Sequence, residues 1–125
     1  MAQTKYSPHE HAAELGIQIH YHNLKTDNGL WIPALNVILL RPRMRVALER
    51  SVCGHEVGHS VLGHSDTSAK SENTANRYAA DRLIDADALL DLMKWRPEQP
   101  ALWSDELEVS HQLLRVYLNV HKLAS

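Results

Sequence analysis

Residues 55–59 of the chain are His-Glu-Val-Gly-His, and they lie within residues 43–64, where apolar residues recur every three or four positions. This spacing predicts a helix with one apolar face. Because each residue turns a helix by about 100°, His55 and His59 point within about 40° of each other, one turn apart. Two imidazoles placed in this way can bind one zinc ion. Glu56 lies at the rim of the same face, where its carboxylate can reach a water at the metal as a general base.

The place of the two histidines on this helix favours a metal site. They fall on the stripe that we expect to be buried, between Val52 and Leu62. Polar groups without partners are costly to bury, and a bound metal ion compensates them. The alternative is a chance match to a short motif on an amphipathic helix, which does not account for this position.

A catalytic zinc site takes three protein ligands, and the third is expected from the next helix, which begins near residue 71 or 72. Glu72 and Asn76 share one face of this helix with its apolar residues, which are Ala79, Leu83, Ala86 and Leu90. A carboxylate on an otherwise apolar face needs a partner, so we predict Glu72 as the third ligand. Asn76, one turn later, is placed to accept a hydrogen bond from the far nitrogen of a liganding histidine. The alternative for Glu72 is a carboxylate at a helix start, stabilised by the helix dipole.

The rest of the chain predicts short helices and strands around these two helices. The expected elements are a helix at 8–15, strands at 17–21, 30–32 and 37–40, and helical segments after residue 104. Asp27-Asn28-Gly29 is a strong turn signal between the first two strands. We therefore expect an α+β fold, in which a small antiparallel three-stranded sheet packs on a helical bundle that contains the zinc helix. The length of 125 residues is typical of one domain, spanning 1–125.

Composition excludes several other classes of protein. The 13 basic and 15 acidic residues give a net charge of −2, so no general attraction to nucleic acid or to an anionic membrane is expected. A single cysteine excludes an internal disulfide framework and a cysteine-rich zinc module. No apolar run approaches the ~20 residues of a membrane span, and residues 1–11 lack the apolar core of a signal peptide, so we expect a cytoplasmic protein.

The run HEVGHSVLGH at 55–64, followed by ENTANRYAADRLID at 72–85, resembles the ImmA/IrrE family of metallo-endopeptidases. The pattern typical of that family is a His-Glu-x-Gly-His helix, then Glu-x-x-Ala-Asn-x-aromatic-Ala-x-x-Leu, and the resemblance extends over roughly residues 8–120. It implies that His55, His59 and Glu72 are zinc ligands and that Glu56 is the general base of a gluzincin-like enzyme. Two positions depart from the family pattern, namely Asp85, where proline is frequent, and the pair Cys53-Gly54.

The resemblance also implies a substrate. Members of the family commonly cleave a helix-turn-helix repressor and so release genes of a prophage, a mobile element or a stress response. The alternative is a non-catalytic antirepressor that keeps a structural zinc and acts by occlusion. Residues 106–115 resemble half of a helix-turn-helix, but their few basic side chains and acidic neighbours do not favour DNA binding. We expect a substrate segment to add as a strand to a sheet edge within residues 30–40.

The other histidines have less specific interpretations. His64 is expected to face the other side of the zinc helix, and His20 and His22 are expected to face solvent. His111 and His121 are both candidates for the cation that stabilises the oxyanion, and the sequence does not choose between them.

Three further features are interpreted as structural. Cys53 lies about 160° around the helix from His55 and is expected to be a small buried residue. Tyr78 is expected in the core. Four arginines near the start of the zinc helix are expected to form a solvated face; they are Arg41, Arg43, Arg45 and Arg50.

Overall fold

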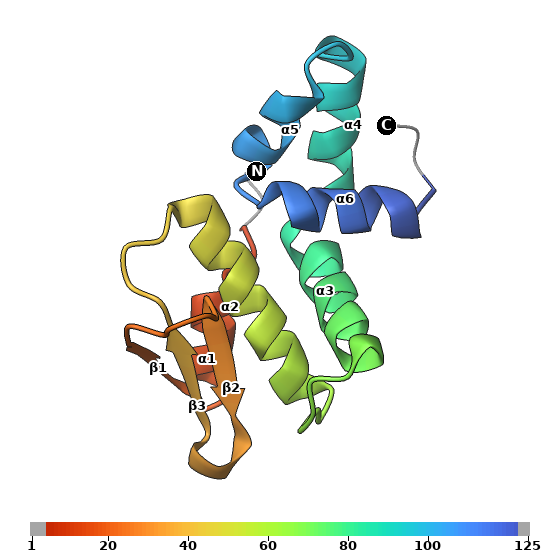
Figure 1. The fold of residues 1–125 in the computed structure, drawn as a ribbon. Coiled ribbons are helices and arrows are strands. Elements are labelled where there is room, and N and C mark those ends of the chain that lie inside the picture. Colours follow the sequence, from red (N-terminus) through yellow and green to blue (C-terminus); the bar gives the residue numbers. More distant parts are fainter. Residues whose placement is uncertain (1–4, 123–125) are drawn as a thin grey trace.

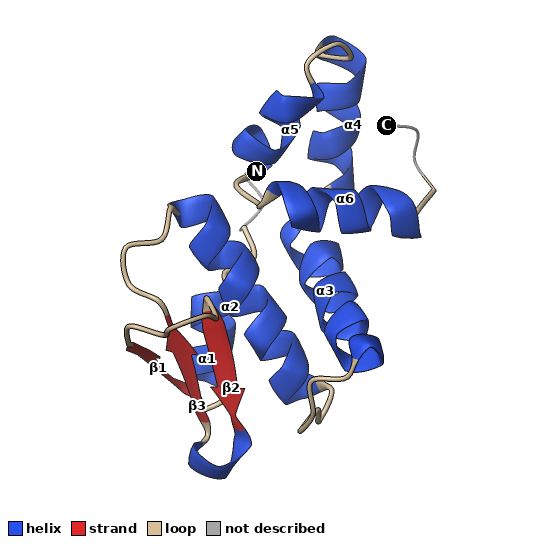
Figure 2. Ribbon diagram, viewed as in Figure 1, coloured by secondary structure: helices blue, strands red, loops and turns tan. Residues whose placement is uncertain are grey.

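The computed structural model describes residues 5–122 of the chain. Its elements, in chain order, are α1 (Pro8–Glu14), β1 (Gln18–Tyr21), β2 (Gly29–Ile32), the 3₁₀ turn η1 (Pro33–Leu35), β3 (Val37–Leu40), α2 (Val46–Val61), α3 (Ala69–Leu83), α4 (Ala86–Trp95), α5 (Pro100–Leu107) and α6 (His111–Val120). The sheet lies at one end, α2 lies between the sheet and α3, and α4 and α5 form the far end (Figure 1). Figure 2 shows how helix dominates around the small sheet. The fold is α+β with the sheet packed on helices, as predicted.

The sheet is mixed, so the prediction of a wholly antiparallel sheet was wrong. The strand order is β1-β3-β2, in which β3 pairs parallel with β1 and antiparallel with β2. Alternating polarity in the sequence indicates which face of a strand is buried, but it does not indicate which strand pairs with it or in which direction. The run of four apolar residues in β3, with Ile38 and Leu40 fully buried, is typical of a central strand. This order leaves β2 as an edge strand beside α2.

Two apolar clusters flank the plane where α2 meets α3. One is formed by residues of the sheet, α1 and α2, and the other is formed by residues of α3, α4, α5 and α6. The two helices approach closely because α2 carries Gly54 and Gly58 on the side that faces α3. A Cβ at Gly54 would lie 3.0 Å from Leu83 Cδ1 and 3.3 Å from the Cβ of Ala79. This close packing brings the first turn of α3 alongside the last two turns of α2.

The helix that follows α2 is shorter than predicted. It ends at Leu83, and Asp85 begins a new helix, since its side chain accepts a hydrogen bond from the backbone N–H of Asp87 at 3.1 Å. Ala86 and Leu90 therefore do not continue the inward face of α3, and Leu90 is 52% exposed. Asp85 stands where proline is frequent in the ImmA/IrrE pattern, and both residue types favour a helix boundary.

Arg50 is not part of a solvated face, so that prediction was wrong for this residue. Its guanidinium is buried and donates hydrogen bonds to the backbone carbonyls of Glu108 at 2.6 Å and Tyr6 at 3.2 Å. It thereby joins α2 to the end of α5 and to the segment before α1. Arg43 and Arg45 are exposed, as expected. No helix in the described part of the chain is long and apolar enough to cross a membrane.

Candidate metal centre

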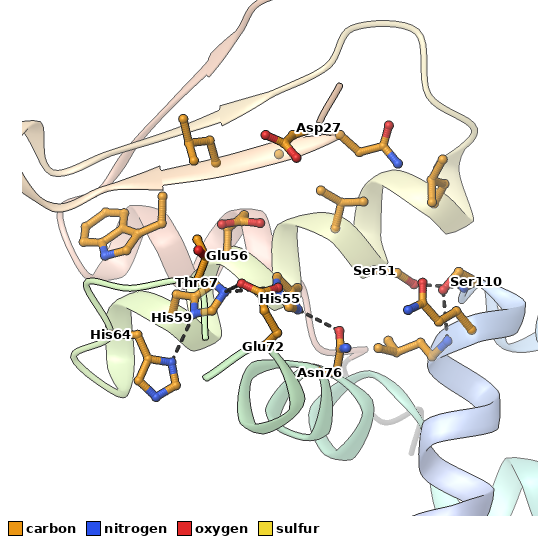
Figure 3. A pocket seen from close by; sticks show the side chains of 18 of the residues that line it. Asp27, Ser51, His55, Glu56, His59, His64, Thr67, Glu72, Asn76 and Ser110 are labelled. Atoms are coloured by element: carbon orange, nitrogen blue, oxygen red, sulfur yellow. Dashed lines mark hydrogen bonds and ion pairs between the residues drawn. The ribbon is translucent and has the colours of Figure 1, made fainter. Parts of the chain in front are cut away.

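Side chains from α2 and α3 converge on one point of the cleft between the sheet and α3 (Figure 3). His55 Nε2 lies 2.9 Å from Glu72 Oε2, His59 Nε2 lies 3.0 Å from Glu72 Oε1, and the two Nε2 atoms lie 3.0 Å apart. Around a tetrahedral zinc ion with bonds of about 2.0–2.1 Å, donor atoms lie about 3.3 Å apart, close to these separations. The structure thus brings together the three residues that the sequence analysis proposed as ligands, and they form a group that can hold a metal ion.

The hydrogen bonds around the histidines leave their lone pairs directed at this point. His55 Nδ1 lies 2.7 Å from Asn76 Oδ1, an acceptor, so Nδ1 carries the proton and Nε2 of the neutral ring carries a lone pair. Burial, and then the neighbouring His55, lower the pKa of His59, which favours its neutral form. With the proton of His59 on Nδ1 as well, two imidazole lone pairs and a carboxylate face one another. A cation relieves their mutual repulsion, so the donor set fits a metal ion.

Glu56 lies next to this group without belonging to it. The residue is 7% exposed, and its carboxylate faces the cleft (Figure 3). Burial raises the pKa of Glu56 to about 7, the nearby Glu72 carboxylate adds to the rise, and a hydrogen bond with the Trp31 backbone opposes it. Glu56 can therefore exchange a proton near neutral pH, as a general base requires.

The cleft around the centre has a volume of about 560 Å³ and is bordered by the edge strand β2. The Arg41 N–H donates to the Asn28 carbonyl at 2.8 Å, so residues 28 and 41 form a hydrogen-bonded pair of the antiparallel ladder. Because such pairs alternate, the backbone polar groups of Gly29 and Trp31 point away from β3. These donors and acceptors lie on the side of the strand that faces the cleft, where the Trp31 backbone hydrogen-bonds with Glu56.

His64 lies in this cleft, contrary to the prediction that it faces the other side of the helix. Its Nδ1 is 3.0 Å from Nδ1 of His59. The prediction continued the helical rotation to residue 64, but α2 ends at Val61 and the chain turns through Gly63, whose φ is +72°. The glycine after a predicted helix was the sequence signal that the rotation stops there.

The remaining candidates lie away from the centre. His111 contacts Ser104, and His121 forms an ion pair with Asp81, and neither histidine lines the cleft. They are therefore not placed to stabilise an oxyanion there. Cys53 is fully buried, and Tyr78 packs against the cluster of the sheet, α1 and α2, as expected for core residues. His20 is exposed on β1 and also lies outside the cleft.

The family of the chain follows from a comparison with family models. Residues 12–119 match the model of the peptidase M78 family, described as the IrrE N-terminal-like domain. The chain belongs to this family. It is therefore a protein of metallopeptidase type, in agreement with the resemblance noted in its sequence. The match to the IrrE N-terminal-like domain runs from α1 to α6, so the segment at 106–115 that resembles half of a helix-turn-helix lies inside this domain. A comparison with curated proteins finds no match.

Proposed function

We propose that this IrrE N-terminal-like protein is a zinc-dependent endopeptidase that cleaves a helix-turn-helix repressor in the cytoplasm. The observation that carries the proposal is the convergence of His55, His59 and Glu72 beside a buried carboxylate that is not among the three. Two histidines and one glutamate with a further position open to solvent are a ligand set typical of catalytic zinc. Glu72 is 39% exposed, so the centre opens into the cleft on its side.

The residues of the chain divide the chemistry between them. His55, His59 and Glu72 would hold the zinc ion, which would supply Lewis-acid polarisation of the scissile carbonyl and of the attacking water. Glu56 accepts the proton of that water and later passes it to the leaving amine, so that the proton count balances over the cycle. A cation bound nearby favours the charged form of Glu56, which is the form that acts as a base.

The border of the cleft favours an extended peptide as substrate. Backbone groups of Gly29 and Trp31 that do not pair with β3 can pair with a peptide that lies along β2 as an added strand, in which case the Trp31 N–H exchanges its contact with Glu56 for the peptide. Among the described residues that line the cleft there is no lysine or arginine, and there are four carboxylates, namely Asp27, Glu56, Asp66 and Glu72. This charge repels the phosphates of nucleic acid and supports a protein substrate.

The repressor as substrate rests on the family resemblance, and it is tested in cells. The chain is co-expressed with the helix-turn-helix repressor encoded nearest to its own gene, and the repressor is followed by immunoblot. We expect fragments with the wild type and intact repressor with Glu56→Gln. Derepression of the target genes by Glu56→Gln, without fragments, would instead support the antirepressor that acts by occlusion.

A further inference from the structure

The contact between His59 and His64 lies on the side of the His59 ring that faces away from the metal centre. His59 Nε2 faces Glu72 and His55, while its Nδ1 lies 3.0 Å from His64 Nδ1. The two rings meet edge to face, with centroids 5.2 Å apart. We propose that His64 is a positioning residue, which holds the His59 ring in the orientation and tautomer that presents Nε2 to the metal. This inference rests on the metal centre of the proposed function.

The proton positions follow from the contacts. A neutral His59 that offers its Nε2 lone pair to a metal carries its proton on Nδ1. That proton is donated to His64 Nδ1, which must then hold a lone pair, so the proton of neutral His64 lies on Nε2. The two tautomers are therefore coupled, and the one that leaves Nε2 of His59 free for the metal requires a lone pair on His64 Nδ1. Metal-binding histidines commonly donate their second N–H in this way to a neighbouring acceptor.

The backbone holds His64 in place independently of any metal. The His64 N–H donates to the His59 carbonyl at 2.9 Å, and the Gly63 N–H donates to the Ser60 carbonyl at 3.3 Å. These two bonds and the left-handed Gly63 form a Schellman motif, which ends α2 and turns the chain back. The backbone of His64 is thus fixed relative to His59, so little additional ordering is needed to form the contact between their rings.

The geometry does not make His64 a further ligand. Its contact is with Nδ1 of His59, whereas Nε2 of His59 faces Glu72, and the group that can hold a metal contains only His55, His59 and Glu72 among the described residues (Figure 3). The centre thus has two supports, because Asn76 of α3 holds His55 and His64 at the end of α2 holds His59.

The test compares two substitutions at one position in the full chain. His64→Leu removes the acceptor and keeps much of the bulk, whereas His64→Asn restores an acceptor oxygen close to where Nδ1 stood. We expect His64→Leu to weaken zinc binding by about 10- to 100-fold in chelator competition, and His64→Asn to recover most of that loss. The visible spectrum of the Co²⁺-loaded protein should change in His64→Leu and return toward wild type in His64→Asn.

Two controls separate positioning from a general structural role. His20→Leu makes the same change at an exposed histidine that hydrogen-bonds with Gln18 and does not line the cleft, and it should leave zinc affinity unchanged. The metal-free His64→Leu protein should remain folded, with a denaturation midpoint lower than that of wild type by no more than the loss of one hydrogen bond explains. Unchanged zinc affinity in His64→Leu, failure of His64→Asn to recover it, or unfolding of the metal-free His64→Leu protein would each overturn the proposal.

The outcomes also distinguish this inference from the proposed function. If the wild type binds zinc but cleaves no repressor, the endopeptidase is wrong, and the affinities of the His64 variants still decide the role of His64. If the wild type binds no zinc, both proposals are wrong. If it binds zinc and cleaves, but His64→Leu matches it in affinity and spectrum, only the role of His64 is wrong.

Discussion

Gly58 on α2 and Tyr78 on α3 lie so close that a Cβ at Gly58 would be 3.1 Å from Tyr78 Cδ1 and 3.2 Å from the backbone oxygen of Ala75. One of these neighbours is backbone, which cannot move without shifting α3 as a whole. The spacing of the two helices, and with it the distance from His59 to Glu72, therefore depends on the absence of a side chain at this position.

Gly58→Ala should destabilise the protein although alanine is the better helix former. The propensity gain is about 1 kcal/mol, and overpacking costs about 1–3 kcal/mol, so we expect a net loss of about 1 kcal/mol and weaker zinc binding. Urea unfolding and chelator competition measure the two effects. Gly54→Ala is the matched control, because its closest contact is the end of the flexible Leu83 side chain, and its loss should be smaller. A Gly58→Ala protein that is more stable than wild type would contradict this account of the interface.

Cys53 should behave as a core residue rather than as a nucleophile. It is fully buried, and burial raises the pKa of its thiol to about 12. At pH 8 the native protein should therefore react with iodoacetamide only as fast as it unfolds, and denaturant should make the reaction fast. Mass spectrometry of timed samples measures the rate. Rapid labelling of the folded protein would show that the thiol is accessible.

The two site helices were predictable because helical spacing is a local property. The period of apolar residues placed His55 and His59 on one face of α2, and it placed Glu72 and Asn76 on one face of α3. The close approach of these two faces depends on glycines in α2. A glycine within a helical pattern does not by itself predict that another helix packs closely against it.

What was not predictable, or was predicted wrongly, depends on where the chain changes direction and on partners far away in sequence. The parallel pairing of β1 with β3 depends on strand order, which the pattern of each strand does not contain. The place of His64 depends on the turn at Gly63, and the burial of Arg50 depends on carbonyl groups of residues 6 and 108.

The metal centre should lose its ion when a ligand is removed. The purified protein should bind about one zinc per chain. Loss of a residue that only supports a ligand typically weakens metal binding about 10- to 100-fold, and His59→Ala and Glu72→Ala should each weaken zinc binding by more than that. Elemental analysis after gel filtration and chelator competition measure both. His20→Ala, at an exposed histidine outside the cleft, is the control. Full affinity in Glu72→Ala would place the third ligand elsewhere.

The edge of β2 should bind the substrate through its backbone. Trp31→Pro removes an N–H that does not pair with β3, whereas Trp31→Ala removes the side chain and keeps the N–H. Because this N–H also contacts Glu56, both variants are best made on a Glu56→Gln background and measured for repressor binding rather than cleavage. We expect the proline variant to bind more weakly than the alanine variant, with zinc content equal in the two. Equal binding by the two variants would place the substrate on another surface.

Glu56 transfers the proton in the proposed zinc-dependent cleavage, and this role is tested by the rates at which zinc-loaded wild type and Glu56→Gln cleave purified repressor. We expect Glu56→Gln to retain about one zinc and to bind the repressor, yet to cleave it about 10²- to 10⁴-fold more slowly than wild type. Mass spectrometry should show that the wild-type fragments add up to the repressor plus one water. Cleavage by Glu56→Gln at the wild-type rate, or a wild type that binds the repressor and leaves it intact, would contradict this role.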